Sequence, residues 1–434
     1  MPLHIRILLG LVLGAVAGVT TNLLTHGGPY TERFVKLVTE PIGKIWLSCL
    51  IMTVIPLIVS SLALGVAGLG DLRKLGRMGA VTLACFLSLT ALATVLGLAV
   101  MNYVRPGDDL DPDVKTRLLE TYRSEAEGAM GLSGTAFSMD LLIKIVPRNP
   151  IKAAAEGDML AIIFFTLVLG AALAALPGER AGPLLALLES LGQATVAIIH
   201  GVMFFGPLGV FCLIYSVTAR FGFDLLLNLL KYVLTVVGSL AFMQVVGYAL
   251  IVRFVAGRNP WEFLRKIRLV MITAFSTSSS SATLPTTMQV AQEELGLPRE
   301  VAGFVLPLGA TLNMNGTALY EGATVLFLAQ VFGLPLSFGE QLIVVLMSVV
   351  TAIGVAGIPG GSLPLLMMVL GMVGVPMEGI AIILGIDRIL DMCRTVLNVT
   401  GDLVTAAIVN RVEGRLGGGP GESSSSPTPL APKA

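Results

Sequence analysis

The residues with the clearest potential for chemistry lie near the C-terminus, in GIDRILDMCRTVLNVTGD at 385–402. At about 100° per residue, six polar side chains of this segment fall on one stripe of a helix. A guanidinium pairs bidentately with a carboxylate, and a carboxylate pairs with an ammonium group. The stripe therefore predicts a site for a small molecule that carries both kinds of group. Its members are Asp387, Asp391, Arg394, Thr395, Asn398 and Asp402.

The surroundings of this stripe are apolar, because the run PLLMMVLGMVGVP (364–376) comes shortly before it. A charge at the centre of a bilayer costs roughly 2.5–3.5 kcal/mol. Several such charges together approach the whole stability of a domain, about 5–15 kcal/mol. We therefore expect the stripe to face a protected polar interior rather than lipid. The alternative, a solvated amphipathic helix, fits this run poorly.

A second polar segment, LGATLNMNGTALYEG (308–322), interrupts another apolar span. Gly309 and Gly316 permit close backbone approach. An unwound turn here would offer carbonyl oxygens to a hard cation. Glu321 is the only acidic residue of its span, and a poorly solvated site favours its protonated form. We interpret it as a proton carrier. The other polar residues of this segment are Asn313, Asn315 and Thr317.

The serine run Ser278–Ser281 lies in FSTSSSSATLP (275–285), and GVAGIPGGSLP (354–364) is a similar break. Serines at the tip of a hairpin present backbone N–H groups and hydroxyls to an anion. Interrupted backbone at membrane depth survives only where it lines a protein cavity. Each break is followed by a long apolar segment, 299–331 or 377–413. This arrangement predicts two re-entrant hairpins in repeated units, as in secondary transporters.

The composition supports a membrane protein. Of 434 residues, 55% are hydrophobic and 13% are charged, against roughly 25% charged in soluble domains. The 28 basic residues balance the 28 acidic ones, which argues against a nucleic-acid partner. Cys49, Cys85, Cys212 and Cys393 lie far apart in apolar runs, and the three histidines form no cluster. We therefore expect no organic cofactor.

A helix needs about 20 apolar residues to cross the hydrocarbon core. Basic residues follow the second and sixth predicted spans, which places both loops in the cytoplasm if the N-terminus is there. The acidic stretch 105–127 then lies outside. The tail 414–434 is rich in Gly, Ser and Pro, which predicts disorder. Spans are predicted at 7–25, 45–69, 78–104, 158–176, 190–218 and 227–256.

Four motifs in order, SSSSATLP, NMNGTALYEG, AGIPGGS and DMCRTVLNVTGD, closely resemble the dicarboxylate/amino acid:cation symporter family. The resemblance extends from the first span to about residue 413. It implies an all-α homotrimer in the plasma (inner) membrane. Each protomer would have eight transmembrane helices and two re-entrant hairpins, with a transport domain that moves against a scaffold. Residues 1–257 would form the scaffold and part of the transport domain, and 258–413 the C-terminal core.

The resemblance also implies roles for individual residues. Arg394 matches the arginine that holds a distal carboxylate of the substrate, and Asp391 the aspartate that holds its amino group. Ser280 offers its backbone to the α-carboxylate, and the second hairpin closes the site. The other implied substrate contacts are Thr317, Thr395 and Asn398, with Ile358 and Gly360 in the second hairpin.

Two sodium sites follow from the same resemblance. The first combines Asp402 with backbone oxygens of Gly309, Asn313 and Asn398. The second combines Thr311 and Met314 with the carbonyls of Ala352, Ile353 and Val355.

The chain departs from the family at a third sodium site, where Asn315 replaces an aspartate. Phe86 and Leu89 also stand where that site needs polar groups, so that only Thr90 remains. We expect this site to be absent or altered. Glu321 stands where proton-carrying members have glutamate. The family also places an arginine beside the binding aspartate, where this chain has Ser278 or Met392.

Arg388, about one turn before Asp391, is our candidate for that missing arginine. The overall prediction is a symporter of glutamate or aspartate coupled to protons, sodium or both, and not an enzyme. Neutral amino acids and C4-dicarboxylates are the alternatives within the class, opposed by Arg394 and Asp391 respectively. An anion-conducting channel is the alternative from another class.

Overall fold

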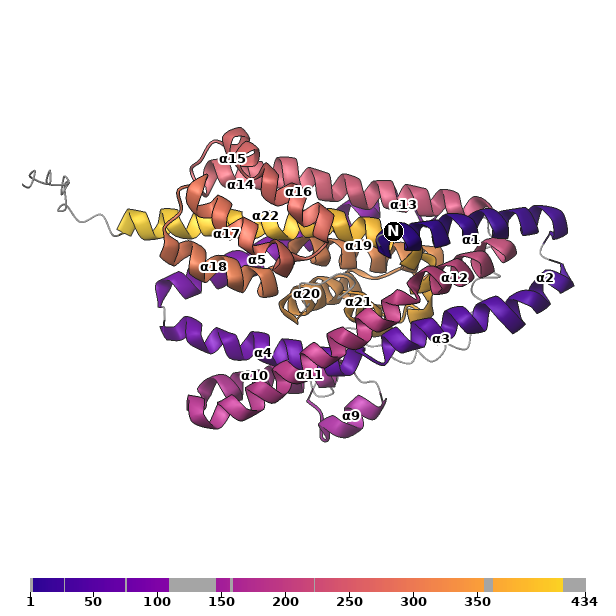
Figure 1. Cartoon of the computed structure of the whole chain (residues 1–434), viewed down its shortest axis with the longest axis horizontal. Helices are drawn as coiled ribbons and strands as arrows, with labels where there is room; N and C mark the ends of the chain where they lie inside the picture. Colours follow the sequence, from indigo (N-terminus) through magenta and orange to yellow (C-terminus); the bar gives the residue numbers. More distant parts are fainter. Residues whose placement is uncertain are drawn as a thin grey trace, which may run out of the picture.

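All the regular elements that the structure describes are helices (Figure 1). The computed structural model describes residues 3–26, 28–74, 76–108, 146–156, 159–221, 223–354 and 362–416. Six helical stretches in these ranges are long and apolar enough to cross a membrane, so several spans of the predicted kind are present. They are Ile5–Thr25, Pro29–Gly68, Arg77–Val104, Gly178–Phe204, Leu227–Phe254 and Ile386–Gly414.

Most helices of the N-terminal half pack on one another, and we call them the scaffold group. Helix α1 packs along α12, α3 also contacts α12, and α4 lies against α10 and α11. The members are α1 (Leu3–Thr25), α2 (Pro29–Phe34), η1 (Val35–Thr39), α3 (Glu40–Ile51), α4 (Val54–Lys74), α9 (Pro150–Glu156), α10 (Met159–Ala175), α11 (Gly178–Phe204) and α12 (Gly206–Phe221).

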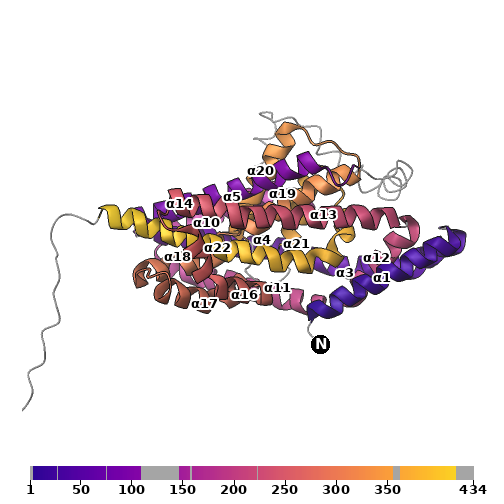
Figure 2. The same cartoon turned by 90° about the horizontal axis from the view of Figure 1, so that it is seen from above.

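The remaining helices surround α22, and we call them the core group. In Figure 2, α22 runs between α16, α17 and α18 on one side and α5, α19 and α20 on the other. Helix α5 packs along α19, and α13 and α14 contact α22, so two spans that precede residue 257 belong to this group. The members are α5 (Arg77–Val104), α13 (Phe223–Phe242), η2 (Met243–Gly247), α14 (Tyr248–Phe254), α15 (Pro260–Lys266), α16 (Arg268–Thr277), α17 (Ser280–Glu293), α18 (Arg299–Leu312), α19 (Asn315–Val331), α20 (Phe338–Gly354), α21 (Leu363–Met372), η3 (Met377–Ile382) and α22 (Leu384–Leu416).

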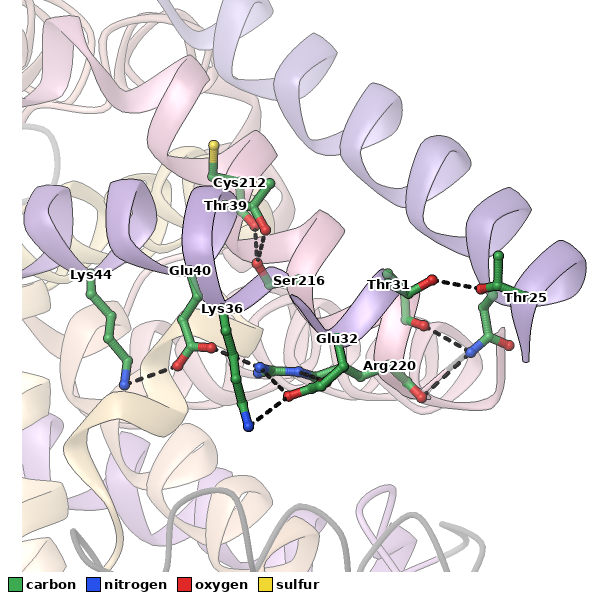
Figure 3. A network of polar contacts seen from close by, with 12 residues as sticks. Thr25, Thr31, Glu32, Lys36, Thr39, Glu40, Lys44, Cys212, Ser216 and Arg220 are labelled. Atoms are coloured by element: carbon green, nitrogen blue, oxygen red, sulfur yellow. Dashed lines mark hydrogen bonds and ion pairs between the residues drawn. The ribbon is translucent and has the colours of Figure 1, made fainter. Parts of the chain in front are cut away.

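The second span is longer than its sequence predicts. It begins at Pro29 rather than at residue 45, because charged residues that look like a loop are helical and paired. Arg220 of α12 contacts Glu32 at 3.0 Å and Glu40 at 2.7 Å (Figure 3). Lys36 and Lys44 contact the same two carboxylates along the helix. These pairs neutralise the polar half of the span.

The span predicted at 190–218 is also different in the structure. Helix α11 begins at Gly178 and ends at Phe204, and α12 starts at Gly206. The early turns of α11 contain Glu179, Arg180 and Pro183. These residues lower the local hydropathy, so the sequence does not indicate that the helix begins here. Pro207 explains the break, since proline is tolerated only in the first turn of a helix.

Both basic segments assigned to one side of the membrane lie at the same end of the molecule. The C-terminal end of α4, the start of α5, helix α15 and the C-terminal end of α22 all lie toward the left of Figure 1. The side of the membrane that this end faces stays a prediction. Helix α22 continues to Leu416, so residues 414–416, which we assigned to the tail, are helical. The rest of the tail, 417–434, and most of the acidic stretch 105–127 lie outside the described residues.

Two interruptions among the described residues bring backbone into the core group. Helices α16 and α17 meet at Ser278, whose φ of 50° is left-handed, and they pack together as a hairpin. Helices α18 and α19 are separated by Asn313 and Met314, which have non-helical dihedrals. Helices α20 and α21 also contact each other, and the segment between them lies outside the described residues. The unwound turn at 313–314 confirms the prediction for this span.

Candidate functional site

The polar stripe of α22 is buried, as its spacing predicts. Arg394 is only 1% exposed, and Asp387 and Asp391 are 5% exposed. The Arg394 Nη1 atom donates to Asp387 Oδ1 at 3.0 Å, and its Nε atom donates to Asp391 Oδ1 at 3.0 Å. Charges at this depth require such partners. The pairing holds the guanidinium in place against the helix.

One end of the Arg394 guanidinium remains available. Its Nη2 atom is buried and has no hydrogen-bond partner in the part of the chain that the structure describes. The ring of Tyr320 on α19 stacks 4.3 Å from the guanidinium carbon and gives a cation–π contact. A buried donor without a partner is costly. The Nη2 atom is therefore poised for an acceptor such as a carboxylate.

Asn398 joins α22 to the interrupted helix α19. Its Oδ1 atom accepts hydrogen bonds from the backbone N–H groups of Gly316 at 2.7 Å and Thr317 at 3.3 Å. N–H groups in the first turn of a helix have no acceptor within their own helix, so Asn398 acts as a cap from another helix. A Cβ at Gly316 would overlap the backbone carbonyl of Arg394. Asn398 and Gly316 together fix the spacing of the two helices.

The first implied sodium site is assembled around Asp402. Its carboxylate is buried and accepts a hydrogen bond from Asn313 Nδ2 at 2.8 Å. Gly309 lies so close that a Cβ there would overlap this carboxylate. The Asn313 Oδ1 atom is buried and unpartnered among the described residues. A buried carboxylate with oxygen atoms beside it suits a hard cation.

The residues implied for a second sodium site lie on α18, on α20 and in the turn before α19. Met314 is buried, and its sulfur accepts a hydrogen bond from Asn398 Nδ2 at 3.3 Å. Thr311 is exposed, and its hydroxyl donates to the carbonyl of Leu308. Ala352 is buried at the end of α20, and Ile353 lies close to Gly65 of α4. Val355 lies outside the described residues.

A neutral hydrogen-bond chain surrounds Asn315. Thr90 donates to Asn315 Oδ1 at 2.7 Å, Asn315 Nδ2 donates to the Tyr248 hydroxyl at 2.9 Å, and Tyr248 donates to the Leu397 carbonyl at 3.1 Å. Phe86 and Leu89 are buried in the core. The side-chain amide of Asn315 therefore has partners for both its oxygen and its nitrogen.

Sequence reasoning missed Tyr248. It follows directly after η2, a π-helical turn that interrupts the span α13–α14. Such turns often occur at functional sites. Nothing in the local sequence points from this tyrosine to Asn315, which lies on another helix. A polar hydroxyl in an apolar span was the only available signal.

Glu321 is fully buried on α19. Thr351 of α20 donates a hydrogen bond to Glu321 Oε2 at 2.7 Å. The other oxygen, Oε1, is buried without a hydrogen-bond partner in the described chain. A buried carboxylate without a paired cation is unfavourable, whereas a neutral carboxylic acid is tolerated. The neutral acid therefore fits these surroundings better, and the contact with Thr351 links α19 to α20.

The turn between α16 and α17 and the start of α21 contribute further polar groups. Ser279 caps α17 by accepting from the Ala282 N–H at 3.1 Å, and Ser280 is buried in the first turn. The hydroxyls of Ser278 and Ser362 are buried without partners among the described residues. Thr317 and Thr395 are buried near the stripe. Ile358 and Gly360 lie outside the described residues.

A pocket beside the stripe has walls from both helix groups. Asp387, Arg388 and Asp391 line it from α22, together with Leu363 and Leu384. The facing wall is apolar and comes from the scaffold group. Its residues are Ile7, Trp46, Met203 and Val210. The charged residues of α22 therefore face the boundary between the two groups.

Apolar helices around a buried charged site are typical of a multi-pass membrane protein that transports a small polar solute. The chain belongs to the sodium:dicarboxylate symporter family, whose profile matches residues 3–412. It is a cation-coupled symporter and not an enzyme.

Several relatives of the chain have been named for the solutes they carry. A proton/glutamate-aspartate symporter of Escherichia coli K12 is 36% identical over 409 residues, covering 94% of this chain and 92% of the relative. A proton/sodium-glutamate symport protein of Bacillus subtilis 168 is 37% identical over 419 residues, with the same coverage. A C4-dicarboxylate transport protein of Anaeromyxobacter sp. strain K is 32% identical over 415 residues, covering 95% of this chain and 90% of the relative.

Proposed function

We propose that this protein is a symporter that carries glutamate or aspartate across the membrane together with protons, sodium ions or both. The observation that carries the proposal is the pairing of Arg394 and Asp391 on one buried stripe. Arg394 has one donor without a hydrogen-bond partner in the described part of the chain, which suits the distal carboxylate, and Asp391 suits the ammonium group. Relatives named as glutamate and aspartate symporters support the same substrates.

The other substrate contacts follow from the same site. The α-carboxylate would meet the backbone at Ser280 and the tip of the second hairpin near Ile358 and Gly360. Thr317, Thr395 and Asn398 would complete the polar wall. The hydroxyls of Ser278 and Ser362, which have no hydrogen-bond partner among the described residues, support an anion site between the hairpins.

Cation coupling would use two kinds of group. A sodium ion would sit at Asp402 with oxygens of Gly309, Asn313 and Asn398. A second would sit among Thr311, Met314 and the carbonyls of Ala352, Ile353 and Val355. Glu321 would carry the proton. The hydrogen-bonded amide of Asn315 supports our expectation that a third sodium site is absent or altered.

For the whole molecule we propose a homotrimer in the plasma (inner) membrane, with eight transmembrane helices and two re-entrant hairpins per protomer, related by inverted repeats. The core group would move as a transport domain against the scaffold group, in an elevator-type cycle. Residues 258–413 would supply most of the moving part. The packing of α5 against α19 supports including that N-terminal span.

Uptake into proteoliposomes tests the proposal. Labelled glutamate, aspartate and serine are offered separately, with sodium and pH gradients imposed one at a time. We expect concentrative uptake of an acidic amino acid and little uptake of serine. Ionic current without coupled uptake would indicate a channel instead. Uptake of serine in preference to aspartate would contradict the assigned role of Arg394.

C4-dicarboxylate transport is a second candidate, favoured by one observation. Arg388 contacts Asp391, so the carboxylate that should repel a dicarboxylate already has a cation beside it. A relative named for C4-dicarboxylate transport agrees with this candidate. Unlabelled succinate in the uptake assay tests it directly.

A further inference from the structure

Asp391 lies between two guanidinium groups on the same helix. Arg394 Nε donates to its Oδ1 atom at 3.0 Å, and Arg388 Nη1 lies 3.5 Å from its Oδ2 atom. Arg388 precedes Asp391 by three residues, which places the two side chains on one face of α22. The expected position of Arg388 beside Asp391 is therefore confirmed.

The surroundings of Arg388 give it few other partners. Its side chain is 18% exposed, and its Nε atom is buried without a hydrogen-bond partner in the described residues. The pocket wall opposite consists of Ile7, Trp46 and neighbouring apolar side chains of the scaffold group. A guanidinium against such a wall depends on nearby anions. The carboxylates in this pocket are Asp387 and Asp391.

The charges of the site sum to zero only when Arg388 is included. Asp387 and Asp391 are negative, and Arg388 and Arg394 are positive. Without Arg388 the empty site would carry one net negative charge. An acidic amino acid has one net negative charge at neutral pH, whereas a C4-dicarboxylate has two. Loss of Arg388 therefore weakens binding of the dicarboxylate more than binding of the acidic amino acid, because the Coulomb energy scales with the ligand's charge.

We propose that Arg388 determines specificity by standing in for the substrate's ammonium group. This inference rests on the proposed function. When an acidic amino acid binds, its ammonium group takes Asp391, and Arg388 yields that carboxylate. When a C4-dicarboxylate binds, Arg388 stays paired with Asp391 and shields the ligand from repulsion. The protein thereby accepts ligands with and without an amino group, and Arg388 sets the ratio of their affinities.

The first test is Arg388→Gln in the full-length protein in proteoliposomes. Unlabelled succinate and aspartate compete against labelled aspartate, and the ratio of their inhibition constants is measured. We expect succinate to weaken about tenfold more than aspartate, in line with the loss of one close charge pair. Arg388→Lys keeps the charge and should keep the ratio. Arg265→Gln, an exposed arginine on α15, is the matched control.

The second test starts from Asp391. In Asp391→Asn, Arg388 loses a carboxylate partner and adds a net positive charge to the site. Binding of labelled succinate and labelled aspartate to purified protein should then shift toward succinate by about tenfold or more. In the double variant Asp391→Asn with Arg388→Gln, that shift should be smaller than in Asp391→Asn, because the ammonium group still lacks its partner but the extra positive charge is gone. The double variant restores the charge balance of the site, so it keeps the test available if Arg388→Gln alone folds poorly.

Different results would contradict the proposed function and the role of Arg388. Absence of acidic amino acid uptake by the wild-type protein would contradict the proposed function. Normal aspartate uptake with no inhibition by succinate would overturn the role of Arg388 alone. An aspartate-to-succinate ratio within about twofold of wild type in Arg388→Gln would do the same.

Discussion

At the scale of single residues, the site depends on pairing buried charges that lipid cannot solvate. Arg394, Asp387 and Asp391 satisfy one another on α22, and a ligand must exchange its own charges for these contacts. Asp402 and Glu321 have no such cation within contact among the described residues. This difference separates the substrate site from the groups that we assign to cations. Each kind of group calls for a different test.

Replacing Arg394 by cysteine should change substrate selectivity. Removing one partner of a buried charge pair typically costs about 3–5 kcal/mol, which is roughly two to four decades in affinity. Arg394→Cys should nearly abolish glutamate and aspartate transport. The variant should retain or gain transport of serine, because Asp391 still holds the amino group. The measurement is competition of unlabelled serine and aspartate against labelled substrate. Aspartate affinity within a few-fold of wild type would remove Arg394 from the site.

Replacing Glu321 by glutamine should uncouple transport from protons. The amide keeps the shape of the neutral acid and still accepts the hydrogen bond from Thr351, but it cannot release a proton. Glu321→Gln should therefore lose concentrative uptake driven by a pH gradient, while exchange of internal for external substrate remains measurable. Glu300→Gln, an exposed carboxyl on α18, is the control. Concentration at the wild-type level under a pH gradient would show that Glu321 carries no proton.

At the scale of elements, the site is an interrupted helix clamped onto an intact one. The break at Asn313 and Met314 frees backbone groups, and Asn398 of α22 satisfies two of them. Helices α19 and α22 can approach because Gly316 has no side chain where the Arg394 carbonyl lies. The spacing of these helices therefore positions the substrate and cation groups together.

Gly316→Ala tests this spacing. The added methyl group would overlap backbone rather than a mobile side chain, so one of the helices must shift. Overpacking of this kind typically costs about 1–3 kcal/mol. We expect a lower thermal midpoint in detergent and at least a tenfold weaker binding of labelled aspartate. Gly303→Ala on α18 is the matched control, since no atom lies within 4 Å of its added carbon. Equal effects of both variants would show that the contact between Gly316 and the Arg394 carbonyl does not set the spacing of α19 and α22.

Local periodicity predicted part of this arrangement. The stripe on α22 and the break at 313–314 could both be predicted from the sequence. Polar residues inside apolar spans must face a protected interior, so they mark such features directly. Periodicity did not reveal contacts between distant helices, such as Tyr248 with Asn315 or Thr351 with Glu321. It also misplaced the start of the second span. The charges of Glu32 and Glu40 resemble a loop until Arg220, far along the chain, is seen between them.

At the scale of the whole molecule, the charged stripe faces a boundary between two helix groups. Asp387, Arg388 and Asp391 meet an apolar wall formed by the scaffold group. Apolar side chains form no hydrogen bonds that would hold the core group in one position. Such a wall therefore suits a boundary along which the core group slides past the scaffold group. The proposed elevator motion requires the two groups to change their contacts at this boundary during each transport cycle.

A covalent link across this boundary should stop transport without abolishing binding. Val210 of α12 and Leu384 of α22 line the same pocket from opposite groups. Both are replaced by cysteine after Cys49, Cys85, Cys212 and Cys393 are removed. Reaction with a short bis-maleimide should then eliminate uptake into proteoliposomes, because the core group can no longer move. Labelled aspartate should still bind the linked protein in detergent.

The control link lies within the core group. Arg77 of α5 and Glu413 of α22 form an ion pair at 2.9 Å, so cysteines at these positions join elements that move together in the proposed cycle. This link should leave uptake near the level of the unlinked protein. Uptake that survives complete linkage of the Val210 and Leu384 positions would contradict the elevator motion. It would favour a mechanism in which only the hairpins open and close.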